Sequence, residues 1–304
     1  MITDQSRSVI ISSKGWVDHD SLWLFETATA EVRNIPLRSG AKYASLHTRA
    51  GEYFAVGHHF DGERFEISVR PFSKPGEPVA NVTVDSASNK LDGDLAAWKS
   101  VPNVYVCYLK LLAFRDFVLV HVDPYRGEAN VRQFGWYDDA YDKGYQGITA
   151  ALELPEENLA LVSIQRCSDL VLHALDSGKM VRKISLAGRF GNGFTAYRRK
   201  ANEIWASDYD HIVTLDRSTF EVKHRKQLQD GNQFIGDFAF SDDESSCVVA
   251  RPFSGDVICV SPNKLDIIAV AKLGKQPLEA ILLSGDRVVA RDWKSGDLLE
   301  GDLE

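Results

Sequence analysis

The chain is 304 residues long, and its 44% apolar and 26% charged residues are typical of a folded globular protein, which excludes an intrinsically disordered one. Its 43 acidic residues outnumber its 35 basic residues and give a formal net charge of −8 without a long run of either sign. We therefore expect neither a general nucleic-acid surface nor a membrane surface. The first residues lack the apolar segment of roughly 7–15 residues that marks a secretory signal, so we expect a cytoplasmic protein.

Seven short apolar runs, each ending on a small residue, recur along the chain and predict its fold. In chain order they are VIIS, YFAVG, VYVC, LALVS, EIWA, CVVA and RVVA. We call the last residue of each run its marker residue; the markers are Ser12, Gly57, Cys107, Ser163, Ala206, Ala250 and Ala290. The intervals between markers are 45, 50, 56, 43, 44 and 40 residues. Four-stranded propeller blades repeat at a similar spacing, roughly every 40–50 residues.

Further strand candidates surround each marker run. A turn and a second strand follow, as in HIVTLD, and the first six units continue to a third strand, as in KMVRKISL. Inner-strand candidates such as ITAALEL lie between units. We predict an all-β, seven-bladed β-propeller of four-stranded antiparallel blades, with residues 1–304 as a single domain. A pair of β-sandwiches would not repeat one marker strand at near-constant spacing. Ring closure is open, because the first unit lacks an inner strand and the last an outer one.

Two stretches resemble the repeat of YVTN-type propellers, which overlap in structure with quinoprotein amine dehydrogenase-like propellers. They are NEIWASDYDHIVTLDRSTFEV and DLVLHALDSGKMVRKISL, in which a strand ends in Asp and a short turn follows. Asp caps such a turn and Gly accepts a positive φ, so these residues are architectural. The resemblance implies the propeller fold and no particular activity. The Trp-Asp dipeptide of WD40 blades is absent.

Basic residues follow several of the markers and predict a binding site. Arg251 and Arg291 come directly after theirs, Arg166 is displaced by two residues, and His58 follows Gly57. Because equivalent positions of a propeller converge near its axis, these residues predict a basic mouth for a carboxylate, a phosphate or an acidic loop. In the structural alternative, the arginines pair with aspartates of neighbouring blades and hold the blades together.

The third unit is the longest, and its excess falls around FGWYDDAYDKGYQG, residues 134–147. We predict that this segment is an inserted loop between an outer strand and the next inner strand. Its aromatic side chains are of the types enriched at binding hot spots, and they are Trp136, Tyr137, Tyr141 and Tyr145. The alternative is that one or two of the rings pack beneath the loop.

These features predict a non-enzymatic scaffold that docks a protein partner through one face, and inhibition or neutralisation of that partner is one possible outcome of docking. The rival is a lactonase-like hydrolase with a site in the central channel. Such a site would need a cluster of oxygen ligands, but the candidate aspartates lack the spacing of a calcium loop. They are Asp138, Asp139, Asp142, Asp208 and Asp210. The four cysteines show no CxxC spacing, so we expect no metal or organic cofactor and no catalytic residue. A monomer is favoured, although the oligomeric state stays open.

Overall fold

Antiparallel strands make up almost all of the regular structure, as the short apolar runs predict. For the strands before residue 152, the structure describes the backbone and only a few side chains. The computed structural model describes residues 9–12, 21–26, 31–36, 42–49, 52–60, 64–71, 74, 77–85, 91–97, 105–111, 116–123, 128–135, 148–164, 169–186, 192–228, 234–241, 243–283, 286–295 and 297–304.

Each described strand pairs with its neighbours in sequence, so every sheet is an antiparallel meander. Two four-stranded sheets come first in the chain: one has β4 (Lys42–Arg49), β5 (Glu52–Phe60), β6 (Arg64–Pro71) and β7 (Ala80–Asp85), and the next has β8 (Leu91–Ala97), β9 (Tyr105–Leu111), β10 (Asp116–Asp123) and β11 (Glu128–Gly135). Two more follow: one has β12 (Ile148–Leu154), β13 (Leu159–Ile164), β14 (Asp169–Ala174) and β15 (Met180–Ser185), and the next has β16 (Asn192–Arg198), β17 (Glu203–Asp208), β18 (His211–Asp216) and β19 (Val222–Gln227). A further four-stranded sheet has β20 (Asp237–Phe240), β21 (Cys247–Arg251), β22 (Asp256–Ser261) and β23 (Asp266–Lys272). Among the described residues, the sheets with three strands are β1 (Val9–Ser12), β2 (Ser21–Glu26) and β3 (Glu31–Pro36); and β24 (Pro277–Leu282), β25 (Arg287–Asp292) and β26 (Leu298–Asp302). A short 3-10 helix, Pro155–Glu157, joins β12 to β13.

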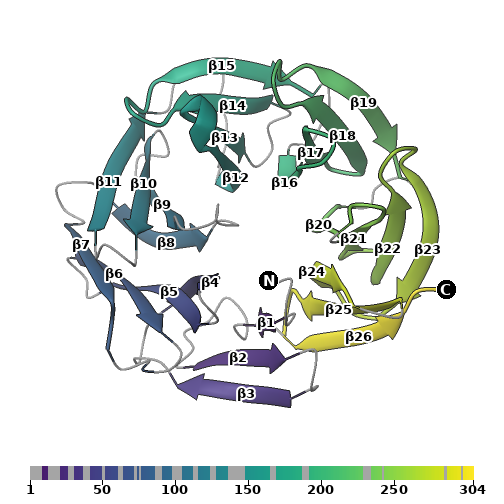
Figure 1. The fold of residues 1–304 in the computed structure, drawn as a ribbon, viewed down its shortest axis with the longest axis horizontal. Coiled ribbons are helices and arrows are strands. Elements are labelled where there is room, and N and C mark those ends of the chain that lie inside the picture. The colour runs from purple at the N-terminus through teal and green to yellow at the C-terminus, as the bar shows by residue number, and fades with distance from the viewer. Residues whose placement is uncertain are drawn as a thin grey trace.

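The sheets stand side by side around a common centre, with the first strand of each four-stranded sheet innermost and the last at the outer edge (Figure 1). This arrangement is a β-propeller. Every marker residue lies in a strand; six of these strands are the second of their sheet, and β1 is the first of its own. The predicted inner strand ITAALEL coincides with β12. Phe134 and Gly135, the first residues of the predicted insertion, are the last residues of β11. Residues 136–147 lie outside the described residues.

Apolar side chains fill the space between successive sheets. One cluster joins the sheets that contain β13 and β17, a second joins those of β17 and β21, and a third joins those of β21 and β25. The second strand of a sheet is buried and the outermost strand is not: every residue of β17 is buried, whereas β19 is mostly exposed. Trp205 is fully buried, and its ring packs edge-on against Phe238 of the next sheet with the centroids 5.8 Å apart.

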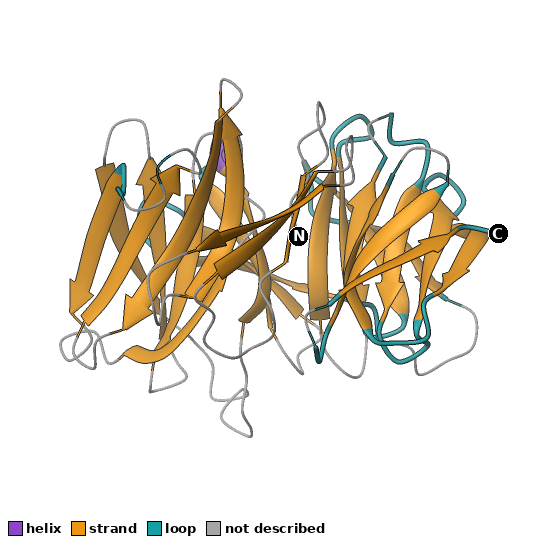
Figure 2. Ribbon diagram, turned by 90° about the horizontal axis from the view of Figure 1, so that it is seen from below, coloured by secondary structure: helices purple, strands orange, loops and turns teal. Residues whose placement is uncertain are grey.

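The meander places the turns of each sheet alternately on two faces (Figure 2). The turns between the second and third strands lie on one face, together with the connections that lead to the next sheet. We call this the upper face, although it points downward in Figure 2, where the 3-10 helix of the opposite face lies near the top. The remaining turns lie on the opposite face, the lower face. Backbone hydrogen bonds agree with this assignment: Ile235 N–H, in a connection, donates to Tyr209 O, in a second-to-third-strand turn, over 2.9 Å.

Polar contacts join neighbouring sheets on the lower face. Arg217 lies in the β18–β19 turn and pairs with Glu156 and Glu157 of the preceding sheet, at 3.0 and 2.8 Å. Arg198 of β16 donates to Asn263 Oδ1 of the following sheet over 2.7 Å. Lower-face side chains therefore reinforce the stacking of sheets.

The C-terminus also lies against a neighbouring sheet. Glu304 and Val270 of β23 exchange two backbone hydrogen bonds, of 3.0 and 3.3 Å. The C-terminal end accordingly lies beside the outer edge of β23 (Figure 1). β26 is the last described strand of its own sheet, and Glu304, which follows it, pairs with a strand of the preceding sheet.

Candidate interaction face

Three aromatic residues occupy equivalent places in the upper-face turns of successive sheets. Tyr209, Phe253 and Trp293 each stand three residues after a marker, namely Ala206, Ala250 and Ala290. A residue at this offset falls just beyond the end of the second strand or within the turn that follows it. The repeat therefore places one large ring in each of three adjacent turns.

The turn that carries Trp293 is fixed by one carboxylate. Asp292 is buried, and its Oδ1 accepts hydrogen bonds from the backbone N–H groups of Lys294 and Ser295, at 2.9 and 2.7 Å. Its Oδ2 accepts a hydrogen bond from Gln276 N–H in the incoming connection, at 2.8 Å. Burial alone would raise the pKa of Asp292, but the hydrogen bonds from Ser295 and Gln276 outweigh burial and lower that pKa. The ionised carboxylate thus ties the Trp293 turn to the preceding connection.

The turn that carries Phe253 is fixed by backbone geometry. Gly255 has a φ of +69°, a conformation that favours glycine, and its N–H donates to Arg251 O over 3.1 Å. Its carbonyl accepts hydrogen bonds from the N–H groups of Leu273 and Gly274, at 2.9 and 3.0 Å. The Phe253 turn is therefore held between its own strand and the connection to the next sheet.

Four rings meet on the upper face, and we call Tyr209, Phe234, Phe253 and Trp293 the aromatic cluster. Phe234 belongs to the β19–β20 connection, and its ring centroid lies 6.4 Å from Tyr209, 6.1 Å from Phe253 and 6.3 Å from Trp293. Phe253 and Trp293 are 6.0 Å apart. Phe253 is 53% exposed, and the other three are half-buried. The cluster is thus an apolar surface that spans three sheets and presents one ring prominently to solvent.

Arg251 is engaged within its own sheet. Its Nε and one terminal nitrogen donate to the two oxygens of Asp256, at 2.7 and 2.8 Å. The two residues are opposite one another in the β21–β22 hairpin, and both are buried. Lys272, opposite Asp256 on β23, donates to the same carboxylate over 2.6 Å. Arg251 therefore forms a bidentate internal ion pair beneath the Phe253 turn.

Arg291 is engaged in a similar way. It donates from Nε and a terminal nitrogen to the two oxygens of Glu279, at 3.2 and 3.0 Å, and the two residues are opposite one another in β25 and β24. The negative charge of Glu279 raises the pKa of Arg291. Both ion pairs join strands of the same sheet, whereas the structural alternative expected partners from neighbouring blades.

The remaining predicted binding residues fall where side chains are not described. His58 lies in β5, of which the structure describes the backbone at that position. The others, Arg166, Trp136, Tyr137, Tyr141 and Tyr145, lie outside the described residues. Whether these residues share one binding surface with Arg251 and Arg291 stays a prediction. The aromatic cluster was missed from the sequence, although the recurrence of a ring three residues after a marker is a signal that could have found it.

Three exposed lysines belong to the upper-face segments that flank the turns of Phe253 and Trp293, and we call Lys272, Lys275 and Lys294 the lysine rim. Lys272 is 73% exposed at the end of β23, Lys275 is 51% exposed in the connection to β24, and Lys294 is exposed in the turn beside Trp293. Lys275 pairs with Asp297, which is itself 46% exposed, over 3.2 Å. The three ammonium groups are thus exposed, while the carboxylates that pair with Lys272 and Lys275 are the buried Asp256 and the partly exposed Asp297.

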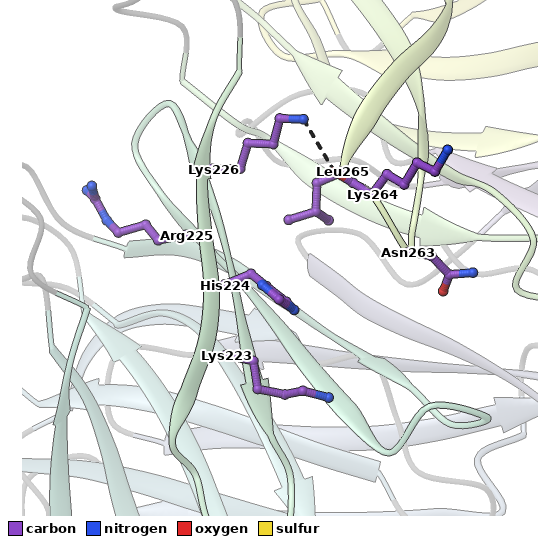
Figure 3. Close-up of a pocket in the computed structure, with 7 residues that line it drawn as sticks. All are labelled: Lys223, His224, Arg225, Lys226, Asn263, Lys264 and Leu265. Carbon is purple, nitrogen blue, oxygen red and sulfur yellow. Dashed lines mark hydrogen bonds between the residues drawn. The ribbon is translucent and has the colours of Figure 1, made fainter.

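A polar groove lies between two neighbouring sheets, with a cavity volume of about 370 Å³ (Figure 3). Its lining residues are Lys223, His224, Arg225 and Lys226 of β19 and Asn263, Lys264 and Leu265 of the β22–β23 turn. Arg225 points away from the other side chains. Three cationic side chains of the groove form ion pairs: Lys223 with Glu203, Arg225 with Asp208 and Lys226 with Asp266. Much of the positive charge of the groove is thus already matched, and Lys226 also donates to Lys264 O across the junction of the sheets.

The described residues contain no group of three or more His, Cys, Asp or Glu side chains that could hold a metal ion. Cys247 and Cys259 are buried free thiols. No helix in the described part of the chain has the length and apolarity needed to cross a membrane.

Comparison with known proteins identifies the fold. No family model matches the chain, and no curated relative does either. The β-propeller domain of Cps50 (Swd1) from Myceliophteria thermophila is 12% identical, with a TM-score of 0.67 over 98% of both chains. A chain of the mitotic checkpoint complex is 8% identical, with a TM-score of 0.69 over 97% of this chain and 87% of that one. The YVTN-type resemblance is narrower than these matches and stays a prediction. The all-β propeller class of the prediction is confirmed, with antiparallel sheets, and the number of blades stays a prediction.

Proposed function

We propose that the protein is a non-enzymatic scaffold, a single seven-bladed propeller over residues 1–304, that docks a protein partner on its upper face. The marker spacing and the ring of sheets in Figure 1 support the number of blades. The structural neighbours include a propeller chain within a multiprotein complex, which is consistent with a scaffold role.

The aromatic cluster is the observation that carries this proposal. Large rings with restricted rotamers are the side chains most often found at binding hot spots, because they bury much area at little cost in entropy. Phe253 is 53% exposed, yet it stands on a turn whose backbone is held by hydrogen bonds at both ends. Together with the three half-buried rings around it, Phe253 forms a contiguous apolar patch, and such patches mark interaction surfaces more often than single exposed side chains do.

The arginines of the upper face have a supporting role in this proposal. Arg251 and Arg291 are each held by a carboxylate of their own sheet, at 2.7–3.2 Å. They stiffen the strands that carry the Phe253 and Trp293 turns. Contact with the partner is therefore assigned to the rings and to exposed groups around them.

Site-specific crosslinking tests the proposal. A photoreactive amino acid placed at Lys294, beside Trp293 on the upper face, is compared with the same group at Lys264 in the lower-face β22–β23 turn. Partners that crosslink at Lys294 are identified, purified and titrated against the wild type, Phe253→Ala and Ile268→Ala. Ile268 is an equally exposed apolar residue, at 58%, on the outer strand β23, so it is a matched control.

We expect crosslinks at Lys294, and we expect Phe253→Ala to weaken binding of the purified partner about thirty-fold, which corresponds to roughly 2 kcal/mol. Ile268→Ala should leave the affinity unchanged. Crosslinks confined to Lys264, or equal affinities for the Phe253→Ala variant and the wild type, would overturn the upper face as the docking surface.

A further inference from the structure

We infer that the aromatic cluster receives an apolar side chain carried on an acidic segment of the partner protein. This inference rests on the proposed function and adds the chemistry of the partner. It follows from the charges that surround the cluster and from how each of them is compensated.

Buried carboxylates beneath the cluster are matched by internal donors. Asp256 is fully buried and accepts from both Arg251 and Lys272, so two positive charges share one negative charge. Glu279 is matched by Arg291. These carboxylates are therefore poor ligands for a cationic partner, because their oxygens are already engaged.

The exposed charges around Phe253 and Trp293 are mostly positive. The lysine rim supplies three ammonium groups, while Asp297 is the exposed carboxylate that pairs with one of them, Lys275. Lys294 makes no ion pair with any described residue. Lys294 is exposed and follows Trp293 directly, so its ammonium group is available at the edge of the apolar surface.

This pattern fits an acidic peptide segment with an apolar anchor. The anchor would contact the rings, and flanking carboxylates would meet the lysine rim. Charge complementarity of this kind raises the association rate and selects against basic segments. A long polyanion such as single-stranded nucleic acid fits less well, since the chain as a whole carries −8 and the basic rim consists of three lysines.

Defined probes separate these partners. Three fluorescent peptides of equal length are titrated into the wild-type protein: one with a central leucine flanked by Asp and Glu, one with the same leucine flanked by Lys, and one acidic peptide with Ser in place of leucine. A single-stranded oligonucleotide of comparable length is the fourth probe. We expect the acidic leucine peptide to bind at least ten-fold more tightly than the other three, and its affinity to fall as salt rises.

Variants test the apolar contact and the charged contact of the peptide separately. Phe253→Ala should weaken the acidic leucine peptide at least ten-fold, while Ile268→Ala leaves it unchanged. The double variant Lys272→Glu/Lys294→Glu should reverse the preference, so that the lysine-flanked peptide binds more tightly than the acidic one. Lys264→Glu makes a similar charge reversal on the opposite face of the same sheet and should have no effect.

Three results would overturn the inference: tighter binding of the lysine-flanked peptide to the wild type, tighter binding of the oligonucleotide, or binding of none of the probes. Each can be told apart from failure of the proposed function. If the purified partner crosslinks at Lys294 and needs Phe253 while no acidic preference exists, the scaffold role stands and the partner chemistry is wrong. If no partner contacts the upper face, the scaffold proposal itself fails.

Discussion

The rings of Phe253 and Trp293 lie with their centroids 6.0 Å apart, although they belong to different sheets. Each stands three residues after its marker, so the contact follows from the repeat: equivalent turns of adjacent sheets lie side by side on one face. Tyr209 has the same offset in the preceding sheet and reaches the other two through Phe234. A periodic sequence thus produces a continuous apolar surface.

The first prediction concerns the stability of this surface. Phe253→Ala should change the free energy of unfolding by less than about 0.5 kcal/mol, because the ring is 53% exposed and belongs to a turn. Trp293→Ala should cost more, about 1–2 kcal/mol, since Trp293 is half-buried and contacts both Phe234 and Phe253. Urea denaturation of the two variants measures both values. A loss of 3 kcal/mol or more for Phe253→Ala would show that its ring is part of the core.

The second prediction concerns the buried ion pair between Arg251 and Asp256. Arg251→Met and Asp256→Leu should each lower the free energy of unfolding by about 3 kcal/mol or more, because each leaves a buried charge without its bidentate partner. The double variant should cost at least 1 kcal/mol less than the sum of the two.

The exposed pair Lys275 and Asp297 is the matched control. Its side chains are 51% and 46% exposed, so Lys275→Met should cost less than about 1 kcal/mol. Additive effects for Arg251 and Asp256 in denaturation would mean that the two charges do not depend on each other, and Arg251 would again be available to a partner.

The sequence predicts the strands of this molecule better than it predicts the surface. The marker runs locate the strands because burial on both sides of an inner strand demands a continuous apolar run, as in β17, where all positions are buried. Composition and spacing then leave a propeller as the natural way to bury both faces of every sheet.

The charges of the site were less accessible to sequence reasoning. Arg251 looked available for a partner because it follows a marker, but a tight hairpin sets Asp256 directly opposite it. Arg291 is matched instead by Glu279 from the preceding strand, at a separation that depends on the exact register of β24 and β25. Phe234 enters the aromatic cluster from a connection, and a connection carries no periodic signal. Register and connections are tertiary properties, which is why this part of the site required the structure.

The third prediction is a pH dependence due to His173. Its ring is fully buried in β14, and desolvation lowers its pKa to about 4, against which the hydrogen bond to Gly178 O at 3.2 Å acts only weakly. The unfolded chain has a histidine pKa of about 6.5, so between these values the unfolded state binds more protons. Stability is therefore full above about pH 6.5 and is lost as the pH falls toward about 4, with a loss of roughly 2 kcal/mol at pH 5.

The measurement is the change in unfolding free energy between pH 7 and pH 5, compared with His173→Gln. Carboxylates that titrate in the same range affect both proteins alike, so the difference between the two isolates His173. Identical pH dependence in the two proteins would show that His173 is protonated as readily in the folded state as in the unfolded one.

The fourth prediction compares two glycines with the same backbone conformation. Gly255 and Gly274 have φ values of +69° and +68°, so alanine at either position costs about 1–2 kcal/mol from the backbone alone. A Cβ at Gly255 would lie 2.9 Å from Lys275 O, whereas a Cβ at Gly274 meets nothing within 4 Å. Gly255→Ala should therefore be clearly the less stable of the two in thermal or urea unfolding. Equal losses would indicate that the connection carrying Lys275 moves aside at little cost.

The fifth prediction concerns the long connection between β11 and β12. Residues 136–147 join Gly135 to Ile148, and both of these ends belong to the upper face by the order of the strands. The aromatic side chains of this segment would then supplement the aromatic cluster as partner contacts.

If Trp136 or Tyr141 is an anchor, its alanine variant should weaken the complex about thirty-fold, or 2 kcal/mol, while changing the unfolding free energy by less than about 0.5 kcal/mol. A ring that packs beneath the segment would give the reverse, a loss of about 3 kcal/mol or more in stability. We expect the first outcome for at least one of the two, because four rings within ten residues exceed what a single loop needs to pack against itself. Normal partner binding by the double variant Trp136→Ala/Tyr141→Ala would restrict docking to the turns that carry Tyr209, Phe253 and Trp293.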